Sequence, residues 1–224
     1  MTASFTIMYD YGGSDIEPGT SLDTDGLNPN LRFKAAETDG GDIDTANPIP
    51  IPDGLGVTKY RSYWKQIYLY CSTAPDTQVD NTQLYSDGTG FGTGIALWAG
   101  DEFPEKTSVS TSGYEVCGGT AATSGEIMTN HGSITGQTDM FSFTDGSALD
   151  VTISEASNVI DAVGESTNYV VLQMEVSSNA SSGDLADETL TFQYDEIWIQ
   201  VYKLVYWYYK TRTLGYDDIE RFIY

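Results

Sequence analysis

Two stretches decide the fold: residues 169–176, YVVLQMEV, and residues 189–196, TLTFQYDE. In both, every second residue is apolar, which is typical of a β-strand with one face against a core. The apolar sets are Val170, Leu172, Met174 and Val176 in the first, and Leu190, Phe192 and Tyr194 in the second. The segment between them, SSNASSGDLADE, is rich in turn residues, so the pattern predicts a β-hairpin.

Similar patterns recur along the chain. Further strands are predicted for SFTIMYD near the start and at residues 62–72, 82–86, 95–99, 140–144 and 149–154. Residues 154–163, SEASNVIDAV, predict one short helix, because Ser154 can cap it and Gly164 can end it. About eight to ten short strands with one helix predict an all-β fold: an immunoglobulin-like or jelly-roll antiparallel β-sandwich with long loops.

The chain divides into three regions by composition. Residues 1–60 combine a first strand with an arm or loops rich in Pro, Gly and Asp. Residues 61–198 form the expected sandwich core, and residues 199–224 an aromatic C-terminal extension. Within the first region, NPIPIP at residues 47–52 suits an extended arm, because proline cannot donate to a sheet.

The charge balance excludes two classes of partner. The chain holds 10 Lys+Arg against 33 Asp+Glu, for a net charge of -23. A nucleic-acid binder needs a basic surface, and an anionic membrane repels an acidic chain, so neither partner is expected. Residues 199–224 contain four basic and three acidic residues, so the negative excess belongs to the rest of the chain.

The sequence also offers few candidate catalytic residues and no recognisable export signal. The single histidine, His131, lies in a polar stretch and is interpreted as a loop residue, so neither a catalytic triad nor a zinc site is expected, and the protein is predicted not to be an enzyme. Cys71 and Cys117 are interpreted as buried free thiols, with a disulfide as the alternative. The start, MTASFTIMYDYGG, does not resemble a signal peptide, which predicts synthesis in a cytoplasm.

Two kinds of ligand fit the loops and strands. Calcium is the one candidate cofactor, because Asp39, Asp42 and Asp44 supply closely spaced oxygen ligands, although they do not complete an EF-hand loop. A glycan could stack on Trp64, Trp98 or the tyrosines of residues 62–72. For each set the alternative is structural: an acidic turn, or packing in the core.

The aromatic extension is the strongest candidate for an interface. Its hydrophobic and aromatic content is too high for a free tail, and Tyr and Trp are common interface anchors. Its pattern suits either a strand or a helix, which could cover its own sandwich or a partner. The predicted interface residues are Trp198, Tyr202, Tyr206, Trp207, Tyr208, Tyr209 and Phe222.

A family resemblance supplies a functional expectation. The segments NPIPIP (47–52), WKQIYLYCSTAPD (64–76), DGTGFGTG (87–94), ISEASNVIDAV (153–163) and residues 168–197 resemble uncharacterised virion-associated proteins of tailed phages, archaeal viruses and proviruses. The stretch ASSGDLADETLTFQYDEI also resembles the last hairpin of immunoglobulin-like domains. The resemblance covers roughly residues 20–197 and carries no catalytic motif.

The resemblance implies a non-enzymatic structural component of a virus particle, such as a capsid decoration, fibre or tail and neck surface protein. Such a protein would be made in the host cytoplasm and would assemble, through its arm and aromatic tail, with copies of itself or other virion proteins. One alternative is a carbohydrate-binding module, with or without calcium, that recognises a cell-surface glycan. The other is an extracellular filament or surface-layer subunit.

Overall fold

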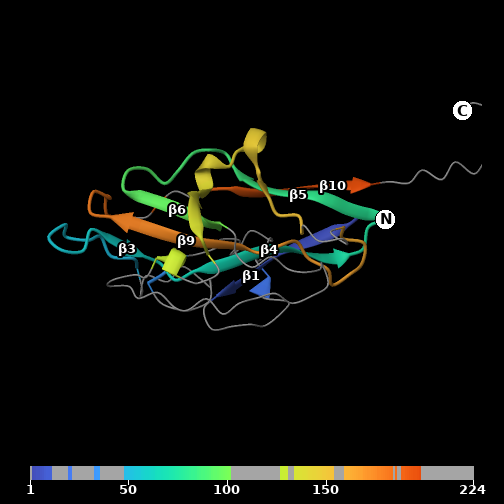
Figure 1. The fold of residues 1–224 in the computed structure, drawn as a ribbon, viewed down its shortest axis with the longest axis horizontal. Helices are drawn as coiled ribbons and strands as arrows, with labels where there is room; N and C mark the ends of the chain where they lie inside the picture. Colours follow the sequence, from blue (N-terminus) through green and yellow to red (C-terminus); the bar gives the residue numbers. More distant parts are fainter. Residues whose placement is uncertain are drawn as a thin grey trace, which may run out of the picture.

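Two antiparallel sheets face each other in the structure, a computed structural model (Figure 1). It describes residues 2–11, 20–21, 33–35, 48–101, 127–130, 134–153, 159–183, 185 and 188–197. The predicted all-β sandwich is therefore confirmed.

The larger sheet has seven strands, and six of them form a continuous path. In spatial order these are β2 (Thr20–Ser21), β1 (Ser4–Tyr11), β4 (Lys65–Thr73), β9 (Val170–Ser177), β6 (Ile95–Asp101) and β7 (Gly136–Asp139). The seventh strand, β3 (Lys59–Arg61), also pairs with β9. Since β1 pairs with β4 from Ser4 to Tyr11, the N-terminal strand is a full member of this sheet.

The smaller sheet has three strands, β10 (Leu190–Ile197), β5 (Gln78–Ser86) and β8 (Leu149–Asp150), in that order. Its inner face and that of the larger sheet enclose the main core. Fully buried side chains from both sheets meet there, including Leu84 of β5, Leu97 of β6 and Leu172 of β9. Phe192 of β10 packs against the same cluster, as its place in the alternating pattern predicts.

The other face of the larger sheet is also covered. Trp64, Met128, Ile134 and Val171 form one buried cluster on it, and Met8, Tyr68 and Tyr169 form another. Every residue of β9 from Val170 to Val176 is consequently buried, on both faces of the sheet. Val170, Leu172 and Met174 face the main core, as the alternation of residues 169–176 predicts, but the opposite face of the strand is packed under other segments of the chain.

The predicted hairpin between residues 169–176 and 189–196 is wrong. β9 lies in the larger sheet between β4 and β6, whereas β10 is at the edge of the smaller sheet and pairs with β5. The connecting residues pass from one sheet to the other, so the turn chemistry between the strands was right and the pairing was not. Packing the apolar face of β10 across the core is what separates the two strands.

The predicted helix at residues 154–163 is wrong in the part that the structure describes. Val159 to Val163 contain no helix, and Ile160 instead forms a bridge with Val79 of β5. Residues 154–158 lie outside the described ranges. Ile160 is buried with Cys71 and Val79, so it fills the end of the sandwich in an extended conformation.

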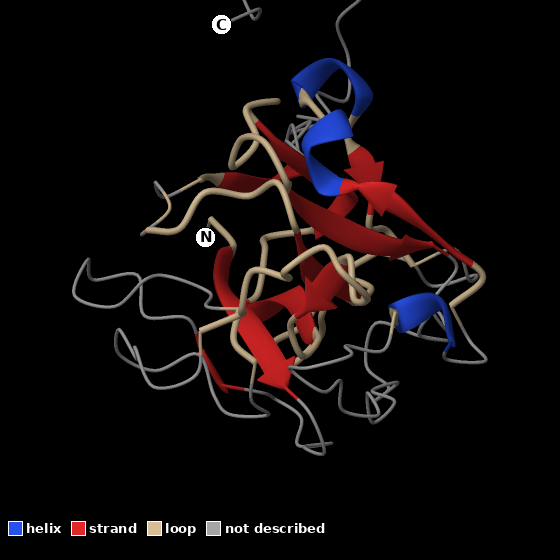
Figure 2. Ribbon diagram, turned by 90° about the vertical axis from the view of Figure 1, so that its left-hand side faces the viewer, coloured by secondary structure: helices blue, strands red, loops and turns tan. Residues whose placement is uncertain are grey.

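Within the described ranges the helices are single 3-10 turns: Met128–Asn130, Met140–Ser142 and Asp145–Ser147 (Figure 2). The second replaces the strand predicted at residues 140–144, because the Asp139 side chain accepts a hydrogen bond from the Phe141 backbone N–H and starts a turn there. No helix in the described ranges is long and apolar enough to cross a bilayer.

Candidate functional site

The site residues predicted from the sequence all lie outside the residues that the structure describes. These are the interface set Trp198, Tyr202, Tyr206, Trp207, Tyr208, Tyr209 and Phe222 and the calcium set Asp39, Asp42 and Asp44. Both sets therefore stay predictions. Among the described residues no group of three or more His, Cys, Asp or Glu could hold a metal ion.

The described structure leads directly to the aromatic segment, residues 198–224. The last described strand is β10, which ends at Ile197 on the edge of the smaller sheet. β10 is paired on one side by β5, and no described strand pairs with its other side. The edge strand and the outer face of its sheet therefore form the surface from which the predicted interface segment departs.

The outer face of the smaller sheet carries acids and amides. Along β5 this face presents Gln78, Asp80, Gln83 and Tyr85, and β10 presents Thr191, Gln193, Asp195 and Ile197 beside them. Asp150 of β8 stands opposite Gln83. We call the outer surface around Asp80, Asp150 and Asp195 the acidic face; Asp150 and Asp195 are exposed and Asp80 is partly buried.

A β-bulge explains how Asp80 reaches this face. Between Asp80 and Gln83, β5 contains one more residue than the opposing stretch of β10, and Asn81 adopts a left-handed φ of 48°. Strict alternation would put Val79 and Leu84 on opposite faces, because five positions separate them. The extra residue returns both to the core, where each is fully buried, and leaves Asp80 outside.

The bulge also places two like charges in register. Asp80 and Asp195 are direct partners across β5 and β10. Like charges that lie directly opposite each other destabilise a sheet. Amides moderate the contact: Asn81 Nδ2 donates to Asp195 Oδ2 at 2.8 Å, and Gln78 Nε2 donates to Asp80 Oδ2 at 3.4 Å. Within the described ranges neither carboxylate has a cationic partner.

The inner side of β10 is fixed to the rest of the sandwich. The Phe5 and Tyr194 rings lie 4.7 Å apart between centroids, and Glu196 Oε1 accepts a hydrogen bond from the Ala3 backbone N–H at 2.8 Å. Both contacts join β10 to the N-terminal end of β1. The acidic face is thus held on a rigid support, which favours its use as a binding surface.

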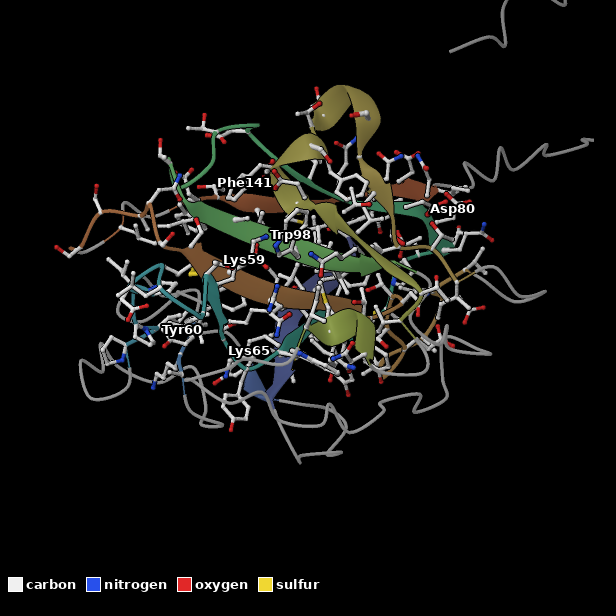
Figure 3. The ribbon with its side chains drawn as sticks, turned by 60° about the vertical axis from the view of Figure 1, so that its left-hand side comes forward. Lys59, Tyr60, Lys65, Asp80, Trp98 and Phe141 are labelled. Atoms are coloured by element: carbon white, nitrogen blue, oxygen red, sulfur yellow. The ribbon has the colours of Figure 1, made fainter. Side chains whose placement is uncertain are left out.

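A second polar cluster lies on the outer face of the larger sheet, at the other end of the molecule. Glu175 Oε1 contacts Lys59 Nζ at 2.6 Å and Glu175 Oε2 contacts Arg61 at 2.5 Å. In Figure 3, Lys59 and Tyr60 lie at the opposite end from Asp80. The Glu175 side chain is 6% exposed and its charge is balanced, so this cluster acts as a structural link between β3 and β9.

The aromatic residues considered for sugar stacking are mainly in the core. Trp64 is 3% exposed and Tyr68 is fully buried, so neither offers a free ring face. Trp98 and Tyr70 are partly buried. Cys71 is a buried free thiol, in agreement with its interpretation, whereas Cys117 and His131 lie outside the described residues.

Comparison of the chain with family models, curated proteins and solved structures finds no match in any of the three. The class that the fold defines is an all-β sandwich.

Sequence reasoning missed the acidic face. It limited β5 to residues 82–86, although the strand begins at Gln78, because QVDN contains residues that are uncommon in strands. The short apolar spacing of Val79 and Leu84, with Asn between them, is the signal that could have indicated a bulged strand.

Proposed function

We propose that the protein is a non-enzymatic structural component of a virus particle that associates with copies of itself, or with other virion proteins, through residues 198–224. One observation carries the proposal: β10 is an eight-residue edge strand that runs directly into the segment containing the predicted aromatic anchors. An edge strand presents unpaired backbone N–H and C=O groups, to which another chain can add a strand.

The composition of the segment supports the same function. Residues 198–224 contain two tryptophans and six tyrosines, which are among the side chains that most often anchor interfaces. The resemblance of residues 20–197 to virion-associated proteins supplies the expected location, a virion assembled in a host cytoplasm. The arm at residues 48–52 has a smaller role in this proposal, because Ile49 packs on the core and Pro52 is buried.

Deletion of residues 198–224 tests the proposal. All described strands end by Ile197, so the shortened chain should keep its far-UV and near-UV circular dichroism spectra and its cooperative unfolding. The full chain should form oligomers in native mass spectrometry, and the shortened chain should be monomeric. A shortened chain that assembles like the full chain would contradict the role of this segment. Mass spectrometry of purified particles from the producing host would test the location.

A further inference from the structure

The distribution of basic residues on the molecule is the starting point. Of the 10 basic residues in the chain, four are in the aromatic segment: Lys203, Lys210, Arg212 and Arg221. Lys59 and Arg61 pair with Glu175, and Lys34 and Lys65 are buried. The other two, Arg32 and Lys106, lie outside the described residues. The aromatic segment is thus the densest group of basic side chains in a strongly acidic protein.

The acidic face has the complementary character. β5, β8 and β10 contain no Lys or Arg at all. Asp80 and Asp195 oppose each other directly, so a cation placed over them would relieve a repulsion that the folded chain otherwise retains. Tyr85 adds a partly buried aromatic ring to this face, and Ile197 at the end of β10 adds an apolar side chain that is 38% exposed.

The sequence after β10 indicates which chain provides the cations. From Ile197 to Leu214 there is no Gly, Pro, Asn or Asp, and the first of these is Gly215. A tight reversal that folded Lys203 back over Asp195 of the same chain would need such turn residues. The nearest basic residues are therefore better placed to reach a neighbouring molecule than their own sheet.

We propose that the acidic face receives the basic aromatic segment, residues 198–224, of a second copy of this chain. Each copy then offers one face and one segment, so the contact is heterologous and generates a ring or an open fibre. Aromatic side chains of the incoming segment bury area, while its Lys and Arg residues neutralise Asp80, Asp150 and Asp195. This inference rests on the proposed function and adds the docking surface to it.

Charge reversal on the face provides the first test, in the full chain. The double variant Asp80→Lys/Asp195→Lys should raise the concentration needed for half assembly at least about tenfold in sedimentation velocity. A matched control, Asp53→Lys/Asp145→Lys, changes the net charge equally at exposed positions outside the face and should assemble like the wild type. Circular dichroism and urea unfolding verify that both variants are folded.

Complementation provides the second test and identifies the donor chain. A segment variant, Lys203→Gln/Lys210→Gln/Arg212→Gln, keeps a functional face but offers no charge of either sign to the lysine-bearing face of the face variant, whereas the face variant keeps a functional segment. At a concentration just sufficient for assembly of the wild type, neither variant should assemble alone. Their mixture should form a one-to-one dimer that does not grow, because only one productive contact remains. A mixture that stays monomeric, or a face variant that assembles normally, overturns the proposal.

The outcomes separate this inference from the proposed function. If deletion of residues 198–224 abolishes assembly while the face variant assembles like the wild type, the segment docks elsewhere and only the acidic face is rejected. If the wild type is monomeric at every concentration, the second-copy assignment fails together with the self-association in the proposed function. A monomer in which the face variant exposes residues 198–224 to protease identifies docking within one chain, which also overturns the second-copy assignment.

Discussion

At the scale of single residues, Glu175 shows how much the polar side of β9 depends on pairing. Its carboxylate lies under the surface of the larger sheet and is balanced by Arg61, whose side chain is 15% exposed, and by Lys59, which is 47% exposed. Removing one partner of a buried pair costs more than the pair contributes, because the other charge is left desolvated. The contribution of Glu175 to stability therefore depends on the presence of Arg61, whose positive charge it helps to balance.

Glu175→Gln should lower the free energy of unfolding by about 1.5–3 kcal/mol, since the neutral amide replaces the carboxylate that accepts charge-assisted hydrogen bonds from both Lys59 and Arg61. Lys59→Met is the matched control on the same carboxylate. It should cost less than about 1 kcal/mol, because the Lys59 side chain is half exposed and Arg61 remains in place. Urea unfolding measures both. Equal losses for the two variants would contradict this assignment.

Cys71 and Tyr194 make stability depend on pH on the alkaline side. Burial, reinforced by the negative charge of Glu165, raises the pKa of the Cys71 thiol above its ordinary value of 9.0. Burial and then the charge of Glu196 raise the pKa of Tyr194 above its ordinary value of 10.0. In both cases the folded protein favours the neutral form, so the unfolded chain loses these protons first as the pH rises.

Their contribution to stability is therefore fully present below pH 9.0 and decreases as the pH rises above that value. The midpoint of urea unfolding should fall between about pH 9 and 11 in the wild type. Cys71→Ala and Tyr194→Phe should each show a shallower fall over this range than the wild type, whatever their stability at neutral pH. A wild-type curve that stays level above pH 9.0 would disprove the assignment.

At the scale of elements, the sequence predicted the positions of the strands better than it predicted their pairing. Residues 169–176 and 189–196 are strands, and their apolar faces both meet the main core. The alternation within a strand is local and can be read from the sequence. Whether two consecutive strands pair with each other depends on all the other strands that compete for the same edge. In this protein β10 pairs with β5 and not with β9.

Gly94 is a point where an element depends on one backbone position. It has φ of +81° just before β6, and its carbonyl accepts hydrogen bonds from the backbone N–H and the hydroxyl of Ser177. A Cβ at this position would lie 2.5 Å from the backbone nitrogen of Ala180. The close approach joins the start of β6 to the turn after β9.

Gly94→Ala should therefore destabilise the protein by at least about 2 kcal/mol, because left-handed strain and a backbone clash combine. Gly92→Ala is the control: Gly92 has φ of +96° but nothing within 4 Å of an added Cβ, so only the conformational cost of about 1 kcal/mol applies. Thermal unfolding compares the two. Similar melting temperatures would show that the turn after β9 yields to the added methyl group.

At the scale of the whole molecule, the two faces of the sandwich differ in what covers them. The outer side of the larger sheet is buried under residues such as Trp64, Met128 and Ile134. The outer side of the smaller sheet is open over Asp195 and Gln193 in the described ranges. This asymmetry, together with the basic residues that follow β10, leads to the assembly in which one copy supplies the segment and the next supplies the face.

The sequence by itself determined the all-β class, the acidic surface and the positions of the main strands, because these follow from composition and from alternation over a few residues. It also identified the aromatic segment that the proposed function uses. It did not determine that β9 is buried on both faces or that β10 pairs with β5. It also missed the bulge at Asn81 that brings Asp80 opposite Asp195. These features depend on contacts between residues far apart in the chain, so only the tertiary structure determines them.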